Sequence, residues 1–160
     1  MTGASRERVR TALDHREPDR IPFDLGGSRM TGIHVRAYTR LRAALGLPPG
    51  DVRVGDLTQQ LADVDTDVMD LLGCDVRLVG PRSATGYRRE VVEADGYLSF
   101  RDEWGVGRRM PVDGGLYYDS FGEPLGGEVD AATIDAFAWP DPTDPGRYAG
   151  MVEAARQIAK

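Results

Sequence analysis

The sequence predicts an α/β fold built from βα units, with an antiparallel β-meander inserted into it. Residues 21–25 alternate between apolar and polar or small side chains, which is the period of a strand, and the glycine pair Gly26-Gly27 follows them. A helical pattern over 35–45 comes next, and the order strand, glycine loop, helix is the opening of a βα unit. Between residues 86 and 121 the period changes from helical to strand-like, which predicts the meander.

The elements around this opening unit follow from local signals. A narrow apolar stripe predicts a helix over 5–16, with Ser5 as its N-cap and Pro18 closing it. Pro22 lacks a backbone donor, so the strand at 21–25 is expected at a sheet edge or at a strand start. A second short strand is predicted at 52–54.

The strongest periodic signal predicts an amphipathic helix over 57–72. Asp65 is a possible internal N-cap, so one helix and two abutting helices are both compatible with the pattern. Gly73 ends this region, and 75–79 alternates as a third strand. Because a helical crossover separates each strand from the next, we expect 21–25, 52–54 and 76–79 to lie parallel in one sheet.

The meander is predicted from four strand-like runs. Residues 87–93 and 97–103 flank Asp95-Gly96, a hairpin signal, and two further runs at 104–110 and 116–121 complete it. Two helices are expected after it, a short one over 130–138 and a last one over 147–159.

Composition limits the classes of function. The chain has 160 residues, which corresponds to a single domain spanning 1–160, and a formal net charge of -6 with its basic residues spread along the sequence. A nucleic acid or an acidic membrane surface is therefore not an expected partner. The one cysteine, Cys74, excludes an internal disulfide framework and is most simply a buried apolar residue. No apolar run has the length of a membrane span, so we expect a soluble, cytoplasmic protein.

Few metal or cofactor signals are present. His15 and His34 are the only histidines, neither has a partner at metal-ligand spacing, and one cysteine does not complete a zinc site with them. Asp63, Asp65 and Asp67 alternate, but the glycine and the final glutamate of an EF-hand loop are missing. No cofactor is expected within this chain.

The candidate catalytic residue is Asp56. It follows a predicted strand, and βα barrels carry their catalytic groups at the carboxyl ends of strands. An aspartate at this position is equally able to cap a helix that begins at Leu57. The candidate substrate-binding residues are those of the first loop and its neighbourhood, because such loops often carry the chemistry, although a plain strand-to-helix turn is the simpler interpretation of the glycine pair. These residues are Gly26, Gly27, Arg29 and His34.

Several segments together resemble the uroporphyrinogen decarboxylase family. The most specific is the helix followed by Arg16-Glu17-Pro18-Asp19-Arg20-Ile21-Pro22, which leads into the first strand. Leu71-Leu72-Gly73-Cys74-Asp75-Val76, Asp102-Glu103-Trp104-Gly105 and Trp139-Pro140-Asp141-Pro142 support it. The resemblance spans nearly the whole chain but covers only the N-terminal part of the family's domain.

The resemblance implies a (β/α)8 TIM barrel, which takes roughly 250 residues. About three strands of this chain would belong to such a barrel, so the expected structure is its incomplete N-terminal part, with the meander at 86–121 as a decoration on the catalytic side. An open sheet of few strands leaves an unpaired edge, so the chain is expected to be marginally stable and to self-associate.

The resemblance also implies two kinds of activity. Asp56 matches the position of an aspartate that binds the pyrrole nitrogens in the decarboxylases of porphyrin biosynthesis. Those enzymes carry an arginine-rich R-Q-A-G-R loop after the first strand, whereas this chain has Asp24-Leu25-Gly26-Gly27-Ser28-Arg29. The loop is more similar to that of the methyltransferase-type branch, in which zinc activates a thiol or a corrinoid protein exchanges a methyl group. Zinc ligands in that branch lie in the C-terminal half of the barrel, beyond the segments matched here.

The resulting hypothesis is the N-terminal portion of a corrinoid- and zinc-dependent methyltransferase-type enzyme that acts on a small molecule. Two alternatives stay open: a uroporphyrinogen decarboxylase, and a non-catalytic α+β interaction domain.

Overall fold

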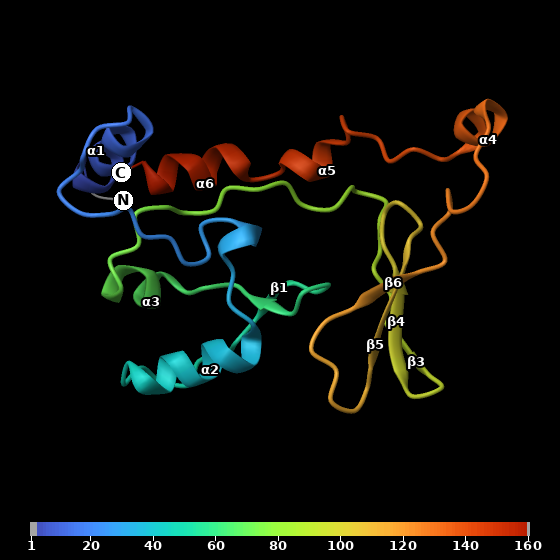
Figure 1. Cartoon of the computed structure of the whole chain (residues 1–160), viewed down its shortest axis with the longest axis horizontal. Helices are drawn as coiled ribbons and strands as arrows, with labels where there is room; N and C mark the ends of the chain where they lie inside the picture. Colours follow the sequence, from blue (N-terminus) through green and yellow to red (C-terminus); the bar gives the residue numbers. More distant parts are fainter. Residues whose placement is uncertain (1–2, 160) are drawn as a thin grey trace. The chain divides into compact units, whose positions relative to one another are not determined.

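The computed structural model describes residues 3–159, and the chain divides into two compact units. The first unit contains residues 1–80 and 150–160, and the second contains residues 81–149 (Figure 1). None of the helices in the described range is both long enough and apolar enough to cross a bilayer.

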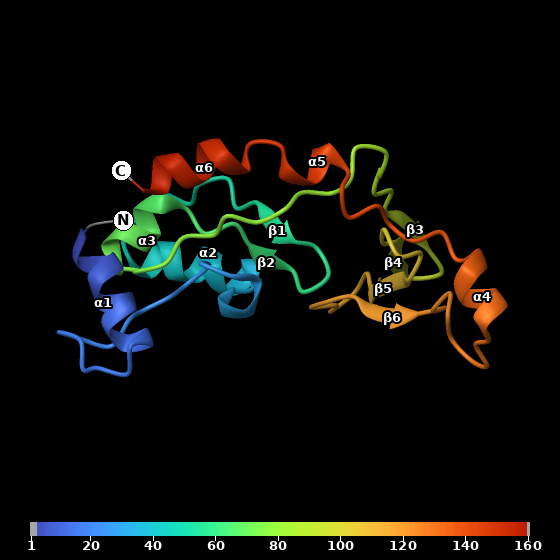
Figure 2. The ribbon, with the colours of Figure 1, turned by 90° about the horizontal axis from the view of Figure 1, so that it is seen from above.

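The first unit is mostly helical, with one small β-ladder. Its strands β1 (Val54–Asp56) and β2 (Leu61–Ala62) pair antiparallel and lie side by side in Figure 2. Its other elements are α1 (Gly3–Leu13), the 3-10 turn η1 (Arg29–Thr31), α2 (Val35–Ala44), α3 (Thr66–Leu71) and α6 (Met151–Ile158).

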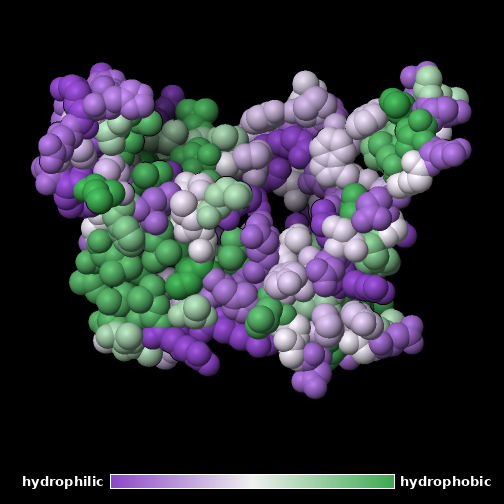
Figure 3. Space-filling view, in the orientation of Figure 1, coloured by the Kyte–Doolittle hydropathy of each residue, from purple (hydrophilic) through white to green (hydrophobic). Residues whose placement is uncertain are grey.

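The core of the first unit lies where α2, β2 and α3 meet. Tyr38, Ala62 and Val68 are buried there, one from each element, and a ring of half-buried aliphatic side chains surrounds them. Hydrophobic residues accordingly gather over α2 and α3 in Figure 3. The Tyr38 hydroxyl donates to the Asp65 carboxylate at 2.8 Å, and the buried Arg42 guanidinium donates to the same carboxylate at 2.8 Å. Apolar packing and a satisfied polar network therefore hold α2 against the start of α3.

Helix α1 contacts the rest of the unit through an ion pair with Asp75. The side chain of Asp75 is fully buried and accepts hydrogen bonds from Arg8 of α1, from Arg20 at 3.1 Å and from the Phe23 backbone N–H at 3.0 Å. Burial by itself would raise the pKa of Asp75, but the hydrogen bonds and the two guanidinium groups hold that pKa below its usual value. The predicted helix over 5–16 is confirmed in its main part, but Ser5 lies inside α1 and is buried, so its assignment as N-cap is wrong.

The predicted parallel sheet of three strands is wrong. Residues 21–25 and 76–79 form no β-ladder in the described chain, although the two segments do run alongside each other. Arg20 donates to the Gly73 carbonyl at 2.8 Å, and the Asp75 N–H donates to the Phe23 carbonyl at 2.8 Å. The first of these bonds comes from the Arg20 side chain, so a single backbone bond joins the two regions and the repeated bonds of a strand pair are missing from the described residues.

The predicted strand at 52–54 is displaced to Val54–Asp56 and pairs antiparallel with Leu61–Ala62. Of the one helix or two abutting helices predicted over 57–72, only the second helix of the pair is present: α3 begins at Thr66, with Asp65 at its N-cap position as that alternative requires, and 57–65 is not helical. The reason is a set of long-range bonds: the Gln60 carbonyl accepts from the Val35 N–H, and the Ala62 N–H donates to the Ile33 carbonyl, both at 2.9 Å. A helix over 57–65 would need these same backbone groups, so the tertiary bonds override the local period.

The antiparallel meander predicted for 86–121 is confirmed in the second unit. Its strands are β3 (Val92–Ala94), β4 (Tyr97–Arg101), β5 (Gly107–Pro111) and β6 (Asp119–Phe121), paired in that order. Asp95 and Gly96 both have positive φ, 51° and 78°, as the tight hairpin turn requires. Phe100, Met110 and Tyr118 are buried in this unit, and the rings of Phe100 and Tyr118 meet edge to face at 5.0 Å.

Two helices follow the meander in the second unit. Helix α4 (Ala131–Ala136) confirms the helix expected over 130–138, and the Asp130 carboxylate caps it by accepting the Thr133 N–H at 2.8 Å. The single helix predicted over 147–159 is interrupted. Helix α5 (Pro145–Tyr148) ends before Gly150, whose φ of 79° separates it from α6.

Candidate functional site

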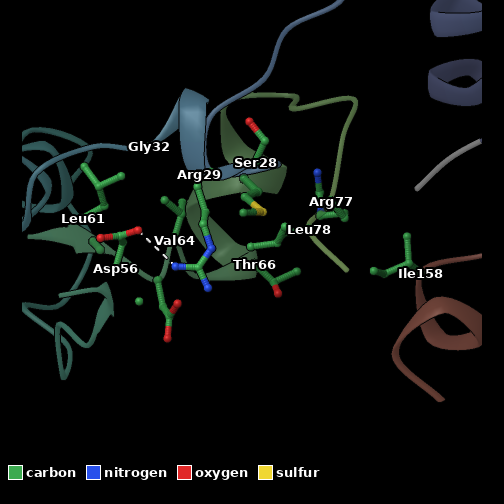
Figure 4. Close-up of a pocket in the computed structure, with 15 residues that line it drawn as sticks. Ser28, Arg29, Gly32, Asp56, Leu61, Val64, Thr66, Arg77, Leu78 and Ile158 are labelled. Carbon is green, nitrogen blue, oxygen red and sulfur yellow. Dashed lines mark hydrogen bonds and ion pairs between the residues drawn. The ribbon is translucent and has the colours of Figure 1, made fainter. Parts of the chain in front are cut away.

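A cavity of about 380 Å³ lies in the first unit (Figure 4). The loop that contains η1 forms one wall, the β1–β2 ladder another, and the beginning of α3 a third. The residues that line it are Gly26, Ser28, Arg29, Gly32, Gly55, Asp56, Leu61, Ala62, Asp63, Val64, Thr66, Met69, Arg77, Leu78 and Ile158. This volume is at the small end of ligand-binding pockets.

The first loop is fixed by its own polar side chains. Asp24 accepts from the Gly27 N–H at 2.7 Å and from the Thr31 hydroxyl at 2.9 Å. Ser28 caps the η1 turn by accepting the Thr31 N–H at 3.2 Å, and Thr31 Oγ1 in return accepts the Ser28 N–H at 3.0 Å. Gly26 has a φ of 80° and packs against Val64, where a Cβ atom would lie 2.7 Å from a methyl carbon. These contacts set the position from which Arg29 extends.

Arg29 and Asp56 form an ion pair at the cavity. Arg29 Nη1 lies 3.0 Å from Asp56 Oδ2, and the exposed fractions of the two side chains are 58% and 14%. The other carboxylate oxygen of Asp56 accepts the Gln59 N–H at 3.0 Å. Asp56 therefore caps the turn between β1 and β2, not a helix, and presents its second oxygen to Arg29. An exposed arginine in such a pair gives little stability and stays free to rearrange toward a ligand.

The structure brings together three of the five predicted site residues. Gly26, Arg29 and Asp56 line the same cavity. Gly27 is not among the described lining residues, because it packs against Asp24 and Val76. His34 also lies outside the lining: it is the N-cap of α2, and its Nδ1 accepts the Arg36 N–H at 3.1 Å.

Sequence reasoning missed four polar residues of the lining, namely Ser28, Asp63, Thr66 and Arg77. Arg77 pairs with Asp70 at 2.6 Å and also donates to the Cys74 carbonyl at 2.8 Å, so its charge is already compensated. Asp63 belongs to the alternating Asp63-Asp65-Asp67 run, which was a visible signal of a polar segment without an assignable role. No group of three or more metal-ligating side chains occurs within residues 3–159.

No protein-family model matches the chain, and neither the curated proteins nor the solved structures compared with it gave a match. The family resemblance therefore depends on the sequence segments quoted above, and the chemistry has to be inferred from the cavity itself.

The cavity combines the exposed Arg29 cation with an apolar wall. Leu61, Val64, Met69, Leu78 and Ile158 provide aliphatic surface, while Arg29, Asp56, Thr66 and Ser28 provide polar groups near one another. Such a lining suits a small molecule that has an apolar body and one charged or hydrogen-bonding group.

Proposed function

We propose that this chain forms part of the substrate-binding site of a methyltransferase-type enzyme of the uroporphyrinogen decarboxylase family. The observation that carries the proposal is the Arg29–Asp56 pair, which lies on a cavity together with Gly26. The resemblance assigns the first loop and the aspartate after the next strand to the catalytic side of a barrel. Residues distant in sequence, 29 and 56, meet at one cavity, as that assignment requires.

The charge of the lining favours the methyltransferase-type branch over a decarboxylase. An octacarboxylate substrate needs several cations to bind its carboxylates. Two arginines line this cavity, and the charge of Arg77 is already compensated by Asp70. Arg29, which pairs with Asp56, is therefore the lining arginine left to bind a substrate. A small substrate with one charged group needs no more than Arg29 supplies. Decarboxylation stays as the second candidate because Asp56 holds a carboxylate at the cavity, where it would stabilise a cationic pyrrole.

The proposal includes zinc, bound by residues other than 3–159, and a corrinoid protein as a separate partner. Residues 3–159 contain no cluster able to hold a metal ion, so no step of the reaction is assigned to a metal in this chain. Its own part is to bind and orient the substrate. A cytoplasmic location is also proposed, because a chain with one cysteine fits a reducing compartment.

The first test of the proposal uses the whole gene product, including any residues encoded after position 160. Methyl transfer from methylcobalamin to a thiol is followed by absorbance, and conversion of uroporphyrinogen is followed by chromatography. We expect methyl transfer without decarboxylation. Decarboxylation without methyl transfer would move the assignment to the second candidate, and the absence of both would contradict the family assignment.

The second test uses variants of the site. Asp56→Asn keeps an oxygen for hydrogen bonding but loses the charge, so it should weaken methyl transfer roughly tenfold and would abolish a decarboxylation that depends on charge pairing. Arg29→Gln should raise KM by roughly tenfold. Arg40→Gln, a change at an exposed residue of α2, is the matched control and should leave both kinetic constants unchanged.

A further inference from the structure

The second unit has a cavity of its own, lined by the segment before β3 and by residues of β3, β4 and β6. Side chains alternate between the two faces of a strand, so the burial of Phe100 and Met110 places Ser99, Arg101 and Arg109 on the opposite face. We call this surface the arginine face and define it by Arg88, Arg101 and Arg109 with the rings of Tyr97 and Phe121.

The Arg109 guanidinium contacts two aromatic rings. Its guanidinium carbon lies 5.2 Å from the centroid of Tyr97 and 5.4 Å from that of Phe121. Both distances are in the range of a cation–π contact. The ring of Phe121 is thereby fixed on the arginine face, where it also lines the cavity.

The cavity has a volume of about 350 Å³, and two more arginines line it. Arg88, Glu90 and Val92 come from the segment that leads into β3 and from β3 itself. The other lining residues come from β4 and β6, namely Ser99, Phe100, Arg101 and Phe121. The apolar lining residues are Val92, Phe100 and Phe121, and the others are polar or charged.

The arginines of this face have no acidic partner. Within residues 3–159, no ion pair joins Arg88, Arg101 or Arg109 to a carboxylate, whereas Arg108 on the other face of β5 pairs with Asp102 at 3.0 Å. One guanidinium nitrogen of Arg101 donates to the Gly105 carbonyl at 2.8 Å, which leaves its other donors available. In a unit where acidic residues outnumber arginines, Arg88 and Arg101 on one cavity without carboxylate partners indicate a site for an external anion.

The charge of the lining defines which anion fits. Arg109 contacts the Tyr97 and Phe121 rings and is not a lining residue, so it is left out of this balance. Arg88 and Arg101 contribute two positive charges and Glu90 one negative charge, so one negative charge on the ligand balances the lining. Val92, Phe100 and Phe121 offer apolar surface, on which an aromatic ring packs well. A guanidinium group binds a carboxylate with two parallel hydrogen bonds.

We propose that the arginine face binds a small aromatic monocarboxylate, with the carboxylate held by Arg88 and Arg101 and the ring packed on Phe121. This site is separate from the cavity beside Arg29, and the proposal does not depend on the function assigned there.

The test is a titration of the isotope-labelled chain, followed by NMR, with benzoate as the probe. Benzoate should shift the amide signals of Ser99, Arg101 and Phe121 in a saturable way. Acetate lacks the ring and benzamide lacks the charge, so each should bind at least tenfold more weakly. Phenyl phosphate carries a second negative charge that Glu90 opposes, so it should bind no more tightly than benzoate.

Variants separate this site from general charge effects. Arg88→Gln and Arg101→Gln should each raise the Kd of benzoate about tenfold, because each loses a charge-assisted hydrogen bond. Arg40→Gln removes an equal charge from the first unit and should leave the Kd unchanged. Glu90→Gln removes the opposing charge and should lower the Kd several-fold, a gain that partial unfolding does not produce.

Four outcomes would overturn the proposal. They are the absence of saturable shifts with benzoate, equal affinity for acetate, tighter binding of phenyl phosphate, and an effect of Arg40→Gln as large as that of Arg101→Gln. The second of these would show nonspecific anion binding only, and the third would show a phosphate site.

Discussion

Asp75 illustrates how one side chain can determine the position of a helix. Its buried carboxylate is the common acceptor for Arg8 of α1, for Arg20 and for the Phe23 N–H. Asp19 in turn binds Arg8 through two hydrogen bonds of 2.7 Å and keeps the guanidinium oriented. A buried group of this kind is costly to break, because removal of one charge leaves the other without a partner in a dry environment.

We therefore expect Asp75→Asn to destabilise the first unit by about 3 kcal/mol at neutral pH. The measurement is urea denaturation followed by circular dichroism. Asp14→Asn is the control, since Asp14 forms an exposed pair with Arg16 and should change the free energy of unfolding by less than about 0.5 kcal/mol. Equal stability of the Asp75 variant and the parent chain would show that the network does not hold α1.

The pH dependence follows from the same carboxylate. The folded state lowers the pKa of Asp75, so its stabilising contribution is fully present above the unfolded pKa of about 3.9 and is lost as pH falls through the lower folded value. Stability should therefore decrease in acid below about pH 4, and the difference between parent and Asp75→Asn should narrow there. Urea midpoints measured across this range provide the check. If the stability difference between the parent and Asp75→Asn widened in acid, the folded state would not lower the pKa of Asp75.

The stability of the hairpin between β3 and β4 depends on the backbone conformation of its turn. Gly96 has a φ of 78° with open space around it, so an added Cβ meets no neighbour but does strain the backbone. Gly96→Ala should cost about 1 kcal/mol and increase hydrogen exchange in β3 and β4. Gly86 also has open space but no positive φ, so Gly86→Ala is the matched control and should be neutral or slightly stabilising. Equal exchange in the two variants would contradict this account of the turn.

The sequence predicted the elements whose causes are local. The Asp95-Gly96 turn and the alternation around it predicted the meander, and the spacing from Val35 to Leu45 predicted α2. The segment from Leu57 to Asp65 has an equally clear helical period but is not helical, because Gln60 and Ala62 bond to residues 33 and 35. Partners that far away leave no trace in the local pattern.

The candidate site was predictable to a similar extent. Asp56 and Arg29 were identified from their places after strand-like runs, and the structure shows that their side chains meet. The structure does not place them at the carboxyl ends of parallel strands, so the incomplete barrel stays a prediction. His34 lies next to the loop in sequence, yet its ring is used to cap α2. Thr66 was missed because the first turn of α3 lines the cavity through tertiary packing, which the local pattern does not report.

At the scale of the whole molecule, the main feature is the small core of the first unit. Three apolar side chains are buried where α2, β2 and α3 meet, whereas large apolar residues such as Ile21, Leu71 and Leu78 are exposed. Exposed apolar surface of this kind favours association. The second unit has its own buried cluster around Phe100 and Tyr118.

We expect the 160-residue chain to be marginally stable and to self-associate with increasing concentration. Sedimentation velocity over a range of concentrations should show species larger than the monomer, and Ile21→Ser with Leu71→Ser should reduce them. Thr39→Ser, a small change at an exposed polar position of α2, is the control. A clean monomer with one sharp thermal transition would contradict the expectation and would also count against a partial barrel.

The link between Arg8 and Asp75 has a consequence for synthesis on the ribosome. The two residues are 67 positions apart, so α1 emerges long before its anchor has been translated. During that interval the helix has only its own hydrogen bonds, and an isolated helix of 11 residues is marginal in water. A nascent chain arrested before residue 75 should therefore expose α1 to protease, whereas one arrested well after it should protect the same segment. Although α1 is translated first, it therefore gains its stabilising tertiary contacts only after residue 75 has emerged.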